Sequence, residues 1–200
     1  MPIITAKQRK IPEILTEQER QKLLFSINNN SLIGLRNLCM LTLMVDIGLR
    51  ISEVINLCNG DINWISGKMI VRQGKGNRDR VLWLNDNDLN LLAQWREKRP
   101  VKVDLLFTTL QGRPVYDVYV RQFLRRLAKK AGITKNIHPH TLRHTFATDL
   151  YRETKDLRLV QKALGHADIS TTMIYTHIVD DQLEEALKNL RRGEKAAAIA

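Results

Sequence analysis

The chain has 200 residues, of which 44% are hydrophobic and 26% are charged, so it suits one mid-sized globular domain and not a disordered chain or a disulfide-stapled miniprotein. Its 32 lysine and arginine residues outnumber its 21 acidic residues and give a formal net charge of +11. This imbalance favours a polyanionic partner, with nucleic acid ahead of an anionic membrane surface.

The sequence indicates neither a membrane anchor nor an oxidising compartment. Its longest apolar stretch, residues 38–45, is far shorter than the roughly 20 residues that a membrane-spanning helix needs. The N-terminus has no signal-peptide pattern. The two cysteines, Cys39 and Cys58, form neither a disulfide framework nor a zinc knuckle. We therefore expect a cytoplasmic protein.

The first part of the chain predicts an arm and two helices. Residues 1–12 are expected to form an N-terminal arm. Thr16, with Glu19 three positions later, has the pattern of a capping box and predicts a helix that ends at the asparagine turn of residues 28–30. Residues 35–47 are apolar nearly all round, which predicts a helix that is buried on most sides.

The next elements are a short helix and the clearest strand signal in the chain. Gly48 is expected to end the buried helix, and a short helix bearing Val54 and Leu57 follows. Residues 69–73 and 79–84 flank a glycine-rich turn, which predicts an antiparallel hairpin. The hairpin carries basic residues that form a second candidate element for contacting DNA: Lys68, Arg72, Lys75, Arg78 and Arg80.

Helical periodicity returns over residues 116–131, where one face is apolar and the rest is basic. From residue 113 to residue 143 there are eight basic residues and a single acidic one, Asp117. A face of one charge repels itself and becomes favourable when phosphates neutralise it. The alternative is that this face only aids solubility.

The C-terminal part is expected to be helical. One helix ends at Gly165, a short one follows Ser170, and a last one covers residues 181–192. No repeat or linker tract divides the chain. The sequence therefore predicts an α+β fold that is mainly α-helical with a small antiparallel sheet, as one domain over residues 13–192 with a tail over residues 193–200.

Several polar residues have ordinary structural interpretations when they are taken singly. Arg50 can cap a helix or pair with a carboxylate such as Glu53. Lys75 suits an ordinary hairpin turn, and Tyr175 suits the core side of a short helix.

A zinc site is a further alternative, because His140 and His144 have the spacing of two ligands on one helical turn. Arg143 between them is a poor neighbour for a dication, and the glutamate of the HExxH motif is absent. We therefore expect no metal here.

Four segments together resemble the tyrosine recombinase family, the phage-integrase, Cre and Xer type of site-specific DNA recombinases. The segments are Gly48-Leu49-Arg50-Ile51-Ser52-Glu53, Gly74-Lys75-Gly76, His140-Thr141-Leu142-Arg143-His144, and Leu164-Gly165-His166 followed by Tyr175-Thr176-His177. The resemblance covers about residues 11–177. The family's catalytic positions match six residues in order and without departure: Arg50, Lys75, His140, Arg143, His166 and Tyr175.

The resemblance implies strand cleavage through a covalent 3′-phosphotyrosyl intermediate on Tyr175. A tyrosine hydroxyl has a pKa of about 10, so its attack on phosphorus needs proton removal and stabilisation of the phosphorane. Arg50 and Arg143 suit that stabilisation, because each guanidinium can donate two hydrogen bonds to non-bridging oxygens and stays protonated.

The remaining matched residues would move protons. His140 and His166 titrate near neutrality and would act as a general base or as further donors to the phosphate. Lys75 would protonate the departing 5′ oxygen. The resemblance implies no metal and no other cofactor, and the chain has neither a Walker loop nor an acidic metal cluster.

The expected partner is double-stranded DNA, with no role for a membrane. DNA contacts are expected from five basic residues: Arg72, Arg78, Arg121, Arg125 and Lys129. The family's last helix often docks onto a neighbouring protomer, so we expect residues 181–192 to support a homo-oligomer, a tetramer on DNA, with packing in cis as the alternative.

Two rival functions and one question of completeness stay open. A catalytically inactive DNA-binding regulator would keep the fold, and a type IB topoisomerase would share the chemistry. Most family members carry an N-terminal DNA-clasping domain. This chain is therefore expected to be either the catalytic part of a longer protein or a naturally short recombinase.

Overall fold

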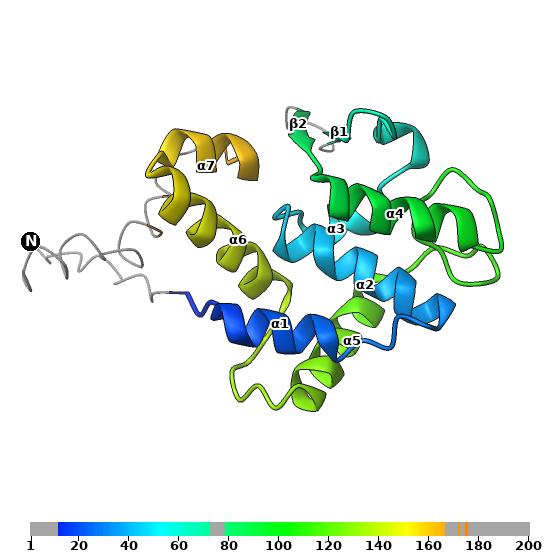
Figure 1. The fold of residues 1–200 in the computed structure, drawn as a ribbon, viewed down its shortest axis with the longest axis horizontal. Coiled ribbons are helices and arrows are strands. Elements are labelled where there is room, and N and C mark those ends of the chain that lie inside the picture. The colour runs from blue at the N-terminus through cyan, green and yellow to red at the C-terminus, as the bar shows by residue number, and fades with distance from the viewer. Residues whose placement is uncertain (1–11, 73–78, 167–171, 173–174, 176–200) are drawn as a thin grey trace, which may run out of the picture.

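The computed structural model describes residues 12–72, 79–166, 172 and 175. Its elements in chain order are α1 (Glu17–Phe25), α2 (Leu32–Val45), α3 (Ile51–Ile55), the 3-10 turn η1 (Asn59–Asp61), β1 (Lys68–Val71), β2 (Arg80–Trp83), α4 (Asp86–Lys98), α5 (Asp117–Lys130), α6 (Pro139–Thr154) and α7 (Leu157–Leu164). Figure 1 shows a mainly helical molecule with one small hairpin, which confirms the predicted fold class. The expected helices after Ser170 and over residues 181–192 lie outside the described residues.

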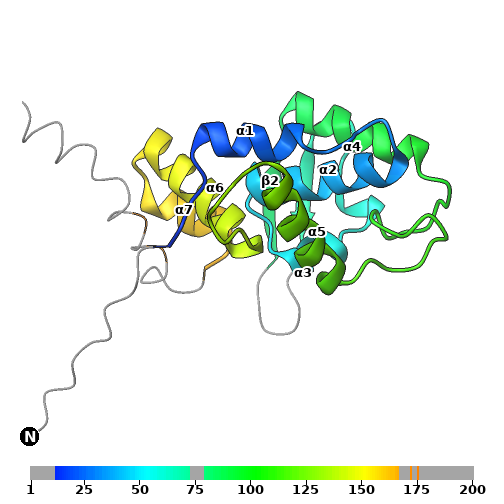
Figure 2. The ribbon, with the colours of Figure 1, turned by 90° about the horizontal axis from the view of Figure 1, so that it is seen from below.

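Helix α1 begins at the predicted capping box. The Thr16 hydroxyl accepts a hydrogen bond from the Glu19 backbone N–H, and the Glu19 carboxylate accepts one from the Thr16 N–H. The helix ends at Phe25, a little earlier than expected, and the Ile27 N–H bonds to the Leu24 carbonyl in a tighter i→i−3 contact. Figure 2 shows α1 along one side of the molecule, with α3 and α5 on the opposite side.

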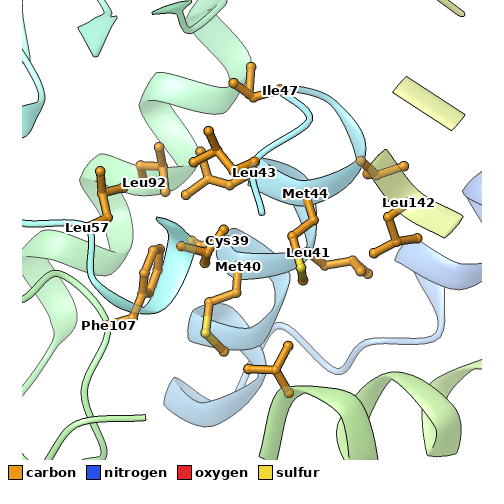
Figure 3. Packing of buried hydrophobic residues seen from close by; sticks show 14 of the residues in the cluster. Cys39, Met40, Leu41, Leu43, Met44, Ile47, Leu57, Leu92, Phe107 and Leu142 are labelled. Atoms are coloured by element: carbon orange, nitrogen blue, oxygen red, sulfur yellow. The ribbon is translucent and has the colours of Figure 1, made fainter. Parts of the chain in front are cut away.

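Helix α2 forms the centre of the core, as its apolar sequence predicts. It begins at Leu32, three residues earlier than expected, because the Ser31 hydroxyl accepts a hydrogen bond from the Gly34 N–H. Nearly all its side chains are buried. In Figure 3, Leu92 of α4 packs on one side of this helix and Leu142 of α6 on the other. Each such fully buried leucine contributes roughly 1.5–3 kcal/mol of hydrophobic stabilisation.

The chain turns sharply after α2, and this turn starts the candidate site. Gly48 has φ +74°, in the left-handed region that favours glycine. An added Cβ there would lie 2.2 Å from Cδ1 of Phe146, so the turn also packs tightly against α6. Helix α3 follows at once and ends at Ile55, before the buried Leu57.

The predicted hairpin is present as an antiparallel pair, with Lys68 opposite Trp83 and Val71 opposite Arg80. Its glycine-rich turn lies outside the described residues. Helix α4, which follows the hairpin, is not predicted from the sequence patterns above. Asn85 caps it, and it buries Leu92 and Trp95. None of the helices in the described part of the chain is long and apolar enough to cross a bilayer.

Candidate active site

Arg143 of α6 connects two of the predicted motifs. Its side chain is buried, with the residue 4% exposed. Nη1 donates to the Gly48 carbonyl at 2.6 Å, and Nη2 donates to the Leu164 carbonyl at 2.5 Å. Since Leu164 ends α7, Arg143 also satisfies a last-turn carbonyl that the helix itself leaves without a partner. The Gly48 turn and the Leu164-Gly165-His166 segment are therefore held to the same side chain.

Arg50 lies at the start of α3 and makes the contact that its structural interpretation predicts. Its backbone N–H donates to Glu53 Oε2 at 2.7 Å, and its Nη1 donates to Glu53 Oε1 at 2.8 Å. The side chain is 32% exposed. Among the described residues, its Nε and Nη2 have no hydrogen-bond acceptor. Arg50 therefore pairs with a carboxylate and still offers donors to a ligand.

Glu53 joins three arginines, a role that the sequence analysis does not predict. Arg80 forms a bidentate ion pair with it, with both N···O distances 2.8 Å, and Arg143 Nη1 lies 4.0 Å from Oε2. Burial raises the pKa of Glu53, but the hydrogen bonds and charges of Arg80, and then Arg50, outweigh burial and hold that pKa below its usual value. One ionised carboxylate thus faces three guanidinium groups, which leaves an excess of positive charge.

This excess of charge acts on Arg143 itself. Burial, followed by repulsion from Arg50, lowers the pKa of Arg143 to about 9. The side chain remains protonated at neutral pH. An anion placed between Arg50 and Arg143 would relieve their mutual repulsion, so the cluster is suited to bind a phosphate group.

His166 is placed by the end of α7. Gly165 adopts φ +64° and ends the helix, and the His166 N–H bonds back to the Gln161 carbonyl. The ring Nδ1 lies 3.1 Å from Oγ1 of Thr172. Burial, then the charges of Arg143 and Arg50, lower the pKa of His166 to about 4. His166 is therefore a neutral imidazole at neutral pH.

His140 lies one helical turn before Arg143 and is exposed. Partial burial of its ring, and then the neighbouring charge of His138, lower its pKa. The i, i+3 spacing on α6 brings His140 and Arg143 to neighbouring positions, as the motif predicts. His140 thus remains accessible to a ligand that the arginines hold.

Tyr175 is enclosed in the described structure. The residue is 1% exposed, and its hydroxyl lies 2.9 Å from Nδ1 of His144. Burial raises the pKa of Tyr175 to about 12, with the Arg143 charge opposing that rise. Burial also lowers the pKa of His144 to about 4, so this is a neutral pair. The hydroxyl has to leave His144 before it can attack any phosphate.

The contact between His144 and Tyr175 is not predicted from the sequence, in which His144 is considered only as a zinc ligand. The core interpretation of Tyr175 holds for the described structure, because the ring packs beside Ala147, Val160 and Leu164. Only the match of six positions in order marked this tyrosine as more than a core residue.

We expect the two half-buried histidines, His144 and His166, to titrate far below free histidine in the DNA-free protein. His144 and His166 should both show midpoints near pH 4. Because unfolded histidine binds protons below about pH 6.5, the folded state should lose stability as pH falls from about 6.5 to 4. Titration of the histidine Cε1–H signals by NMR checks this, and midpoints near 6.5 for both would contradict it.

The hairpin residues have mixed outcomes. Lys75 and Arg78 lie outside the described residues. Arg72 is exposed and donates to Asp61 Oδ1 at 2.6 Å. The expectation that Arg80 lies on a DNA-facing basic element is wrong, because Arg80 is 7% exposed and points into the Glu53 cluster. Strand alternation places its side chain on the buried face, opposite Val71.

The basic face of α5 is present as predicted. Its apolar side packs into the core through Val120, Leu124 and Leu127. Arg125 and Lys129 are exposed, and Arg121 is half-buried with its Nε 3.3 Å from Asp117 Oδ2. Helix α5 packs against α3, and Figure 2 shows the two helices on the same side of the molecule.

Metal binding has no candidate in the part of the chain that the structure describes. No group of three or more histidine, cysteine, aspartate and glutamate side chains is arranged there to hold an ion. The site just described offers donors to an anion, through Arg50, Arg143 and the two motif histidines.

The sequence matches the phage integrase family over residues 13–182. The chain belongs to this family. As a phage integrase family member, it is similar to the tyrosine recombinase XerD of Oceanobacillus iheyensis, with 40% identity over 186 residues that cover 90% of this chain and 62% of that protein. A tyrosine recombinase of Thermosipho africanus is 38% identical over 184 residues, which cover 92% of this chain and 63% of the relative.

Solved structures of recombinases in this family have the same fold. XerA recombinase superposes with a TM-score of 0.79 at 32% identity, covering 92% of this chain and 66% of that one. XerH site-specific recombinase, bound to a palindromic difH substrate after cleavage, gives a TM-score of 0.78 at 36% identity over 89% of this chain and 53% of that one. This chain thus spans less than two thirds of the length of these relatives.

Proposed function

We propose that this chain is the catalytic domain of a site-specific DNA recombinase that cleaves and rejoins strands through Tyr175. The observation that carries the proposal is the arginine cluster around Glu53, in which Arg50 keeps donors without an acceptor among the described residues, beside a buried, protonated Arg143. The similarity to XerD and to DNA-bound XerH supports DNA as the substrate. The family match over residues 13–182 supports a domain that spans residues 13–192.

The chemistry follows from the charges. A scissile phosphate held by Arg50 and Arg143 would have its developing negative charge stabilised by two guanidinium groups that already lie close enough to repel each other. Tyr175 would leave His144, lose its proton and form the 3′-phosphotyrosyl bond while the 5′ oxygen departs. The bond to tyrosine keeps the energy of the phosphodiester, so the same residues can rejoin the strand.

The remaining site residues would assist the transfer. His140 and His166 would accept the tyrosine proton or donate to the phosphate, and Lys75 would protonate the departing oxygen. No metal and no other cofactor is needed for these steps. The reaction would take place in the cytoplasm.

DNA binding by the basic face should depend steeply on salt. The double variant Arg125→Ala/Lys129→Ala should weaken binding and reduce the slope of log K against log salt by about 2, since each lost phosphate contact removes roughly 0.9. The matched control Lys22→Ala/Lys98→Ala removes the same charge from the exposed surface of α1 and α4 and should leave the slope unchanged. Fluorescence anisotropy between about 50 and 200 mM salt measures both, and equal slopes for both variants would contradict the assignment.

The active assembly would be a homotetramer on double-stranded DNA. Residues 181–192 carry an apolar face of Leu183, Ala186, Leu187 and Leu190, which would dock onto a neighbouring protomer. Arg72, Arg78 and Arg121 would add backbone contacts to those of the basic face.

A comparison of three assays on the purified chain tests the proposed function against its rivals. A site-specific recombinase should cleave DNA that carries its site and exchange strands between two such sites. A type IB topoisomerase would instead relax supercoiled plasmid that has no site, and a regulator would bind without cleaving. DNA bound at a specific site without any covalent product would reject the recombinase.

A further inference from the structure

Arg80 is a buried member of the arginine cluster around Glu53 that has no part in the proposed chemistry. It lies at the start of β2 and is 7% exposed. Its Nη1 and Nη2 bind the two oxygens of Glu53, and its Nε donates to the Ala163 carbonyl at 2.8 Å. All three of its nitrogens thus donate to protein, and the side chain is directed at Glu53 and the end of α7.

These contacts join three elements that carry separate site residues. Glu53 belongs to α3, which Arg50 begins, and Ala163 belongs to the last turn of α7, which His166 follows. Arg80 donates a hydrogen bond to the Ala163 carbonyl and Arg143 donates one to the Leu164 carbonyl, and these two carbonyls are neighbours at the end of α7. Cations at a helix C-terminus are favourable because the last carbonyls lack helical partners.

The sharing of Glu53 determines how Arg50 can act. Arg80 donates to both carboxylate oxygens of Glu53. The side chain of Arg50 contacts Glu53 only through Nη1, which donates to Oε1. Without Arg80, Glu53 would have only Arg50 and Arg143 as partners. A buried charge that lacks partners is costly, so the carboxylate would hold both of these arginines more closely. Arg80 satisfies Glu53 and so leaves the guanidinium of Arg50 open.

We propose that Arg80 is a positioning residue that engages Glu53 and the end of α7, so that Arg50 and Arg143 offer their charge to the scissile phosphate. This inference rests on the proposed function. Arg80 acts through Glu53 and does not touch the DNA. Its loss should therefore weaken stabilisation of charge on the non-bridging phosphate oxygens and leave DNA binding intact.

The test uses the full chain and two nicked suicide duplexes, one with an ordinary phosphate and one with a neutral methylphosphonate at the position that the wild-type chain cleaves. Arg80→Met should bind the ordinary duplex with a Kd within twofold of wild type and form the covalent adduct up to about 100-fold more slowly. On the methylphosphonate duplex the defect should shrink to a few-fold, because that substrate carries less charge for the arginines to stabilise.

Two further variants keep the inference testable if Arg80→Met folds poorly. Arg80→Lys keeps the charge without the bidentate geometry and should show an intermediate defect with the same dependence on substrate. Arg36→Met serves as the matched control, since Arg36 is a buried arginine that binds the Thr108 carbonyl and Tyr119 away from this cluster. It should cleave both duplexes at rates close to wild type.

The outcomes separate this inference from the function on which it rests. Equal defects on the two duplexes would mark Arg80 as merely structural and overturn the inference, as would cleavage by Arg80→Met at the wild-type rate. A wild-type chain that forms no adduct on any duplex would instead reject the proposed function, and the inference would fall with it.

Discussion

Arg143→Met is expected to abolish detectable cleavage and to destabilise the fold. Loss of one donor to a developing oxyanion costs roughly 10²–10³-fold in rate, and Arg143 offers a fork of donors. The Gly48 and Leu164 carbonyls would lose their donor, at roughly 1–3 kcal/mol for each buried group left without a partner. Single-turnover adduct formation measures the rate, and urea denaturation measures the free energy of unfolding.

Arg36→Met separates the two effects of the Arg143 substitution. Arg36 is as buried as Arg143 and also donates to a backbone carbonyl, that of Thr108 at 2.9 Å. We expect Arg36→Met to lose a similar amount of stability and to cleave DNA at nearly the wild-type rate. If both variants lost cleavage to the same extent, the loss at Arg143 would be one of folding and not of chemistry.

Gly48→Ala is expected to be the most destabilising small substitution in the site. A non-glycine residue in the left-handed region costs roughly 1–2 kcal/mol. The new methyl group would also lie within 2.2 Å of the Phe146 ring, and such overpacking adds roughly 1–3 kcal/mol. A shift of the backbone that relieves this clash would also displace the Gly48 carbonyl, which accepts a hydrogen bond from Arg143. The cleavage rate should therefore fall together with stability.

Gly132→Ala is the control for Gly48→Ala. Gly132 has φ +69°, close to that of Gly48, but no atom lies within 4 Å of its added Cβ. This variant should show only the backbone strain. The difference in free energy of unfolding between the two variants therefore measures the contact with Phe146, and equal values would contradict the packing described for this turn.

The local parts of the fold could be predicted from the sequence. The capping box of Thr16 and Glu19, the apolar run of α2 and the glycine that ends α7 each act through neighbours in the chain. Helix α4 was missed because its mixed polar sequence buries only a few apolar side chains, such as Leu92 and Trp95. Its stability depends on packing against α2, which sequence periodicity does not reveal.

The site was predicted through its motifs, whereas the contacts that arrange it were not. Glu53 and Arg80 are 27 residues apart, and His144 and Tyr175 are 31 residues apart. No local spacing rule joins such pairs. In the sequence, Arg80 looks like any arginine that could contact DNA. Only the position of Glu53 on another element shows that Arg80 forms an ion pair inside the protein. The roles of Lys75 and Arg78 stay predictions.

Covalent trapping is the most direct test of the central claim that Tyr175 is the nucleophile. The chain is incubated without magnesium with nicked suicide duplexes from the flanks of its own gene, beside a Tyr175→Phe control, and the product is denatured and digested. The account predicts a denaturation-resistant adduct on the peptide that contains Tyr175, and no adduct in the control. An adduct that persists in Tyr175→Phe would contradict it.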